Sequence, residues 1–235
     1  YTEKNTEYHT GKIILATSVQ PDGNRTMSLL SGIIDADIKG HYSLGTLGAS
    51  FKTFLENFIV AFRRQGDVKA DFSEQNFNYS AKIKNFDIIS SIFCPWLNVS
   101  RNATISGSFD APKALFNLKA VADTLSVYGL KLRKFYVHGQ TLNHQLEIQT
   151  GSADVLLWPG ENPTRIYRID SLLLGLSMHT DSILYKLRWG KQHEPAYSGL
   201  IGGYCSFADY PNLNLELNEG EFRIADSLYK FLPGN

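Results

Sequence analysis

The sequence predicts an all-β protein, folded as one elongated, curled antiparallel sheet with one amphipathic helix. Apolar and polar residues alternate through most of the 235 residues, so nearly every segment has one apolar and one polar face. The alternating segments follow one another at intervals of about 8 to 12 residues, which is typical of antiparallel strands. Only one stretch has a helical period, so most of the apolar strand surface has no helix available to cover it.

The chain is expected to begin with a β-hairpin. Residues 11–19 and 27–33 alternate as two strands, and the turn between them, at 20–24, contains a Pro-Asp-Gly sequence that allows a tight reversal. Apolar residues at even positions of 34–44 then indicate a third strand with one apolar face.

An amphipathic helix is expected at about residues 47–64, because apolar residues there recur at spacings of three and four. Thr46 is the candidate N-cap and Gly66 is the expected stop. The apolar face of this helix has to pack against other apolar side chains. The side chains expected to cover the sheet are Phe51, Phe54, Leu55, Phe58 and Phe62.

Alternation resumes after the helix and continues to the end of the chain. An irregular apolar passage at 88–97 interrupts it, and Pro95 argues against a central strand there. The loop 158–163, rich in Pro and Gly, is interpreted as a crossover or an insertion within one domain that spans 1–235. Glu219-Gly220-Glu221 is expected to form a hairpin turn.

The combination of Asp, then Ser or Thr, then an aliphatic residue occurs four times. Asp and Ser side chains bond nearby backbone N–H groups, so each copy is expected at the start of a strand rather than in a catalytic site. The four copies are 123–125, 170–172, 181–183 and 226–228.

Composition and motifs argue against catalysis, metal binding and nucleic-acid binding. The 23 basic residues balance 23 acidic ones without a basic cluster, so nucleic acid is not an expected partner. The six histidines show no ligand spacing and no catalytic or nucleotide-binding motif occurs, so no metal, cofactor or catalytic residue is expected. Glu216, Glu219 and Glu221 could supply a carboxylate pair, but alternation directs Glu216 to solvent. Cys205 is in phase with apolar neighbours, which favours a buried thiol over a disulfide with Cys94.

A long succession of antiparallel strands in one sheet has to curl, and its concave apolar face would form a trough. Such a trough suits acyl chains, which need burial along their length and only a few polar contacts. We expect apolar strand positions to line it, with the helix as a plug or wall. The lining residues are expected to be Phe116, Leu118, Leu125, Val127, Leu130, Leu132, Phe135, Val137, Leu146, Ile148, Leu172, Leu174, Ile183, Tyr185, Leu187, Leu215 and Leu217.

Several segments carry a family resemblance through their order and spacing, which extends over nearly the whole chain. They are 33–47 with the helix that follows, 93–97, 105–109, 187–189, 197–199 with Phe207, and 226–235. Together they resemble the TamB-like proteins of the Bacteroidetes lineage, members of the AsmA-like superfamily. The chain departs from that pattern at Cys94, Trp96 and Tyr229, none of which replaces a catalytic group.

The resemblance implies a fragment of a larger, non-enzymatic protein in the periplasm of a Gram-negative bacterium. An inner-membrane anchor would lie outside these residues, and the body would be a U-shaped "β-taco" with a hydrophobic groove. The family is implicated in conducting phospholipid toward the outer membrane and in assembling outer-membrane proteins with a barrel partner related to BamA or TamA.

Two other interpretations remain open at this point. Exposed strand edges could receive nascent barrel strands by β-augmentation, which would make the protein an assembly factor. Alternatively, the chain could be a secreted carbohydrate-binding or adhesive β-sandwich with a closed core and no lipid role.

Overall fold

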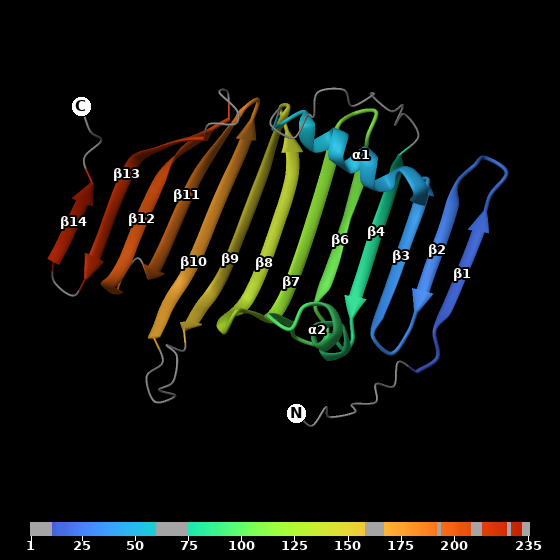
Figure 1. Ribbon diagram of the computed structural model, residues 1–235, viewed down its shortest axis with the longest axis horizontal. Coiled ribbons are helices and arrows are strands. Elements are labelled where there is room, and N and C mark those ends of the chain that lie inside the picture. The colour runs from blue at the N-terminus through green and yellow to red at the C-terminus, as the bar shows by residue number, and fades with distance from the viewer. Residues whose placement is uncertain are drawn as a thin grey trace, which may run out of the picture.

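The alternating segments form fourteen strands in one antiparallel sheet, accompanied by two helices (Figure 1). The computed structural model describes residues 11–59, 75–157, 167–191, 194–207, 213–224 and 227–231. The strands are β1 (Ile14–Val19), β2 (Arg25–Leu30), β3 (Ile34–His41), β4 (Asn76–Ile83), β5 (Leu97–Val99), β6 (Thr104–Asp110), β7 (Leu115–Val127), β8 (Leu130–Leu142), β9 (Gln145–Leu157), β10 (Tyr167–His179), β11 (Ser182–Lys191), β12 (Glu194–Ser206), β13 (Asn214–Ile224) and β14 (Ser227–Phe231). The helices are α1 (Leu44–Glu56) and α2 (Asp87–Phe93).

The strands lie side by side in chain order, and the sheet stays open. Only β5 departs from this order, because it pairs with the part of β7 that lies beyond the end of β6. Within the described residues, β1 and β14 are the two edges of the sheet. The predicted open, curled all-β sheet is confirmed. The described strands form one sheet rather than the two packed sheets of a sandwich.

The first hairpin is confirmed, with shorter strands than expected. The N–H group of Gly23 donates to the carbonyl of Gln20 over 2.9 Å, and Gly23 has φ +82°, which the Asp-Gly sequence accommodates. β1 begins at Ile14 and β2 spans Arg25–Leu30.

The predicted helix exists, but its expected bounds and its expected N-cap were wrong. α1 begins three residues earlier, at Leu44, after the extended residue Ser43, whose side chain makes no cap hydrogen bond. Buried Gln75 instead tethers the start of the helix: its amide nitrogen donates to the Ser43 carbonyl (3.3 Å) and to the Thr46 hydroxyl (2.8 Å), and its amide oxygen accepts from the Ser43 N–H group (3.4 Å). Because Gln75 is distant in sequence, local pattern could not locate this start.

The helix also ends earlier than expected. α1 stops at Glu56, which pairs with Lys52 over 3.3 Å, and a turn carries the chain through Phe58 and Ile59. Phe62 and the expected stop at Gly66 lie outside the described residues, as does the loop 158–163.

The irregular apolar passage at 88–97 contains a second helix, so the expectation of a single helix was wrong. α2 is two turns long and begins at Asp87, whose carboxylate lies in the favourable first turn. Pro95 follows its end and precedes the short strand β5, in agreement with the argument against a central strand. The apolar residues of so short a helix do not extend over the periods needed to recognise it from sequence.

Glu219-Gly220-Glu221 is not a turn but the middle of β13. Gly220 pairs with Phe231 of β14, and a Cβ at Gly220 would collide with the Phe231 ring. The glycine therefore serves close packing of an aromatic ring across strands rather than chain reversal.

A bend crosses the long strands and explains two of the four Asp-Ser/Thr copies. Lys134 in β8 and Ser171 in β10 have φ of +55° and +57°, and the regular pairing of both strands skips them. Asp123-Thr124 and Asp170-Ser171 therefore lie inside β7 and β10, not at strand starts as expected. Buried Asp154 of β9 lies on the same bend, because it pairs with the neighbours of Lys134 and Ser171 in β8 and β10.

The third copy of the motif behaves as predicted and the fourth is only partly described. Asp181 has φ +59° in the turn before β11, which begins at Ser182. β14 begins at Ser227, while Asp226 lies outside the described residues. Short polar side chains tolerate these left-handed conformations, both at turns and at the bend.

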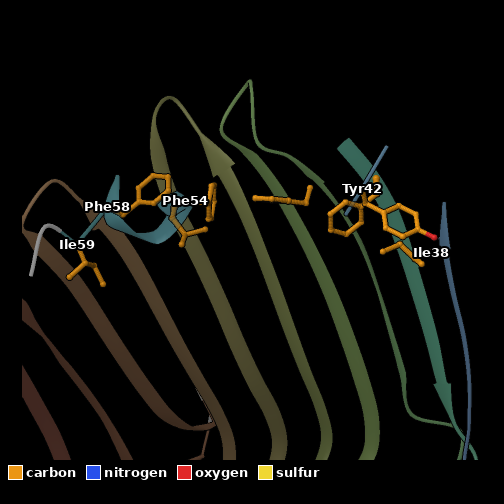
Figure 2. Close-up of a cluster of buried hydrophobic side chains, with 8 residues drawn as sticks. Ile38, Tyr42, Phe54, Phe58 and Ile59 are labelled. Carbon is orange, nitrogen blue, oxygen red and sulfur yellow. The ribbon is translucent and has the colours of Figure 1, made fainter. Parts of the chain in front are cut away.

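The hydrophobic core lies where α1 covers one end of the sheet. Phe54 is 3% exposed, and its ring centroid lies 5.4 Å from that of Phe109 and 5.6 Å from that of Phe116. Figure 2 shows Phe54, Phe58 and Ile59 at the helix end of this cluster and Ile38 and Tyr42 at its other end. The buried cluster comprises Ile38, Tyr42, Phe54, Phe58, Ile59, Phe77, Phe109 and Leu146.

Candidate functional site

An apolar row crosses the whole sheet, perpendicular to the strands. Cross-strand partners share a face of a sheet, so the register of every neighbouring pair traces the row from edge to edge. It takes one residue from each strand of the sheet path, and Thr150 is its only polar member. We call it the central row: Leu15, Leu29, Ala36, Ala81, Ile105, Ala120, Val137, Thr150, Leu174, Leu187, Ile201, Gly220 and Phe231.

Three parallel rows on the same face extend this apolar band, and thirteen of the predicted lining residues fall in the four rows. Val137, Leu174 and Leu187 belong to the central row. The upper row, nearest α1, contains Phe116, Leu146, Ile183 and Leu215; the next row, here the glycine row, contains Leu118, Ile148, Tyr185 and Leu217; and the lower row contains Phe135 and Leu172.

The other four predicted lining residues form a separate group beyond the bend. Leu125 pairs with Leu132 and Val127 with Leu130, beside the short strand β5. Along β7, Leu118 and Ala120 are even-numbered whereas this group is odd-numbered, so the apolar phase changes at the bend. Sequence reasoning placed these four residues in the same lining as the other thirteen. Apolar and polar residues alternate on both sides of the bend, so the change from even to odd positions was not recognised.

The helix packs over the upper row. Phe51, although 39% exposed, and Phe54 pack on Phe116 with ring centroids 5.7 and 5.6 Å away. Leu146 is 2% exposed within this cluster. A charged residue substituted there would disturb folding, so it would not test binding. The covering role expected of Phe51, Phe54, Leu55 and Phe58 is therefore played in a cluster that includes the upper row and, from the glycine row, Tyr79 and Ile148.

Along the central row, the apolar face is open among the described residues. Central-row side chains in the middle of the sheet, such as Leu174 and Leu187, are partly exposed. Exposure rises toward the edges, to 61% at Leu15 and 48% at Phe231. A contiguous row of partly exposed apolar side chains is the kind of surface at which proteins bind partners or ligands.

In the glycine row, two tyrosines lie flat across neighbouring strands. Tyr79 of β4 covers Gly107 of β6, and its hydroxyl donates to the Asn117 carbonyl of β7 over 3.1 Å. Tyr185 of β11 covers Gly203 of β12 in the same way. Burial raises the pKa of Tyr79, so its hydroxyl stays a donor at neutral pH. Flat rings beside glycines keep this row low between its taller apolar neighbours.

Sequence reasoning missed this device because the partners are far apart in the chain. Tyr79 and Gly107 are brought together only by the pairing of β4 with β6. Aromatic residues and glycines alternate in many strands, so neither residue alone is a signal; the register is needed.

Replacing Tyr79 with Phe is expected to lower the free energy of unfolding by about 0.5 to 1.5 kcal/mol, because the hydrogen bond to Asn117 is lost while the ring stays. Urea denaturation of the variant measures this loss. The control is Tyr128→Phe, because Tyr128 is 79% exposed and its variant should stay within about 0.5 kcal/mol of the wild type. Equal effects in the two variants would contradict the assigned role of Tyr79.

The opposite face of the sheet is polar, as the alternation predicts. Lys186 and Glu219 pair there over 2.8 Å. The Tyr204 hydroxyl donates to the Glu216 carboxylate over 2.5 Å, and this hydrogen bond raises the pKa of Tyr204. Glu216 is exposed, in agreement with its predicted direction.

An open cavity of about 920 Å³ lies on this polar face, over strands β7 to β13. Its lining contains polar-row residues such as Lys119 and Gln149 and, between the polar rows, residues of the glycine row, among them Ile148 and Tyr185. None of the tall apolar neighbours on the other face, such as Val137, Leu174 or Met178, contributes to it. The cavity therefore lies on the polar side of the sheet and meets the apolar band only at the glycine row.

Both cysteines are free, which agrees with the thiol interpretation of Cys205. The described residues contain no group of three or more His, Cys, Asp or Glu side chains that could hold a metal ion. Among the same residues, no helix is both long and apolar enough to cross a membrane. No family model, curated protein or solved structure matches the chain.

Proposed function

We propose that this protein is a non-enzymatic lipid carrier of the bacterial envelope, similar to TamB-like proteins, which holds the acyl chains of phospholipid along the apolar face of its sheet. The observation that carries the proposal is the central row, an apolar path that is broken only by Thr150 and that α1 leaves uncovered. Burial of acyl chains offers about 0.8 kcal/mol per methylene, so roughly ten buried methylenes offset an association cost of about 8 kcal/mol.

The dimensions of the band favour conduction over storage of one lipid. Thirteen strands at a spacing of about 4.8 Å give a path of roughly 58 Å along the sheet. That is nearly twice the roughly 30 Å hydrocarbon thickness of a bilayer. A path of this length has room for several acyl chains in succession, which suits passage from the inner toward the outer membrane through the periplasm.

Mass spectrometry of the purified protein under native conditions tests the proposal. Phospholipid should co-purify from cells, and a delipidated sample should extract fluorescent phospholipid from vesicles. Protein that stays free of lipid in both measurements would overturn the proposal.

Assembly of outer-membrane proteins is the second candidate function, and the edges of the sheet favour it. Every residue of β1 is exposed, and so is every residue of β14. Unpaired backbone groups at such edges can accept a further strand, which is the mode of β-augmentation. A barrel protein related to BamA or TamA would be the partner in this role, and crosslinking from β14 in cells would identify it.

A further inference from the structure

The cavity on the polar face has the lining of a binding site for a ligand quite unlike a lipid. Four exposed carboxamide side chains surround it, and each offers two donors and an acceptor. Two Lys and two Glu side chains add charges that sum to zero when His138 is neutral. The carboxamides are those of Asn117, Gln140, Gln149 and Asn218, and the charged residues are Lys119, Lys186, Glu147 and Glu219.

The floor of the cavity is open because a glycine lies there. Gly175 of β10 is flanked by Gln149 and Lys186 in the register, and the only atom near its missing side chain is the Lys186 carbonyl oxygen at 4.0 Å. On the next pair of strands, Glu219 lies over Gly202, so that a Cβ there would come within 2.6 Å of the carboxylate. Glu219 in turn pairs with Lys186, which fixes one wall.

Apolar contact is available at two places beside these polar groups. Leu184 lines the cavity although its row is otherwise polar, and it is 53% exposed. Tyr136 lies flat over Gly151 just beyond the lining, with its ring centroid 5.4 Å from that of His138. Both offer flat or aliphatic surface to C–H groups, within an array of hydrogen-bond donors and acceptors.

From this lining we infer that the polar face binds a neutral, extended oligosaccharide across β7 to β13. An anionic ligand would need an excess of cations and a cationic ligand an excess of carboxylates, and the lining has neither. Hydroxyl groups of a sugar both donate and accept, which matches carboxamides and paired charges, while the sugar's C–H faces match Leu184 and Tyr136. The site lies on the face opposite the apolar band and does not depend on the proposed lipid function.

Isothermal titration of the whole protein with three neutral hexasaccharides tests the inference: cellohexaose, maltohexaose and chitohexaose, with inorganic phosphate as the anionic probe. At least one hexasaccharide should bind and phosphate should neither bind nor compete. Failure of all three at about 10 mM, or competition by phosphate, would overturn the inference.

Variants locate the site. Gly175→Leu should weaken binding at least about tenfold, since the new side chain fills the floor without a backbone clash. Gln149→Ala, at an exposed position, should also weaken it and serves if Gly175→Leu fails to fold. Gly48→Leu, in open space on α1, is the control and should bind like the wild type. Unchanged oligosaccharide binding in the first two variants would overturn the assignment of the site to this cavity. Leu174→Glu, on the apolar face, should leave oligosaccharide binding intact whatever its effect on lipid binding.

Discussion

Replacing Leu174 with Glu is expected to abolish phospholipid binding while the sheet stays folded. Leu174 is in the central row between Thr150 and Leu187, four strands from the edge strand β14. A carboxylate there would have to lose its water against an acyl chain, which costs several kcal/mol without a partner, whereas a tenfold loss of affinity needs only about 1.4 kcal/mol. The side chain is partly exposed in the lipid-free protein, so the carboxylate can remain hydrated and folding should change little.

The chain supplies a matched control for this variant in the adjacent residue. Leu173 is also a partly exposed leucine of β10, but it lies on the opposite face, paired with Gly151 and Arg188. Leu173→Glu introduces the same charge one residue away, beside a guanidinium group. Lipid extraction from vesicles should therefore be lost in Leu174→Glu and kept in Leu173→Glu, with equal circular dichroism spectra. Equal lipid binding by the two variants would show that the apolar band does not hold the lipid.

Replacing Phe54 with Ala is expected to lower the free energy of unfolding by about 3 to 5 kcal/mol. Its ring is almost fully buried, and the ring centroids of Phe58, Phe109 and Phe116 lie 5.2, 5.4 and 5.6 Å away. The truncation leaves a cavity between α1 and the sheet at the centre of the core cluster, where these rings cannot all move to fill it.

Urea denaturation followed by tryptophan fluorescence measures this loss, and Phe93→Ala is the matched control. Phe93 ends α2 with 78% of its surface exposed, so its removal should change stability by no more than about 0.5 kcal/mol. A cost below about 1 kcal/mol for Phe54→Ala would mean that α1 does not dock on the sheet in solution. The undocked helix would also uncover the upper row, so lipid uptake would then exceed that of the wild type.

Local pattern was sufficient for the strands but not for the ends of the helix. Alternation predicted the all-β class, the first hairpin and the direction of Glu216. Helical spacing found Phe51, Phe54 and Phe58, yet α1 starts at a residue fixed by Gln75, which is tethered from the far side of the connection to β4. The N-cap prediction for this helix failed because the side chain that stabilises its start is not adjacent to it in sequence.

Glycine in a strand was the residue type that sequence interpreted least well. The sequence around Gly220 has the composition of a turn, but the structure uses the missing side chain to seat the ring of Phe231. At Gly107 and Gly203 the absence of a side chain likewise lets a tyrosine lie flat across the sheet. What a strand glycine does depends on the residue opposite it, and only register supplies that residue.

For the candidate sites as well, the sequence showed which residues are apolar, and only the strand register showed which residues are neighbours. Alternation grouped Leu172 with Leu174 and left Leu173 for the other face, but it could not say which residues of the neighbouring strands lie beside them. Pairing to Gly151 and Thr150 assigns Leu173 to the polar face and Leu174 to the apolar band. The cavity around Gly175 had no sequence signal, because its lining comes from strands as far apart in the chain as β7 and β13.

By itself, the sequence determined the class of the protein, a succession of antiparallel strands with more apolar surface than its helices can cover, because strand period and turn chemistry are set by residues a few positions apart. The tertiary structure alone decided the continuity of the central row, the bend that separates Leu125 and Leu132 from it, and the polar cavity on the other face. These depend on inter-strand hydrogen bonding, which fixes the register between residues distant in the chain and so determines which side chains share a surface.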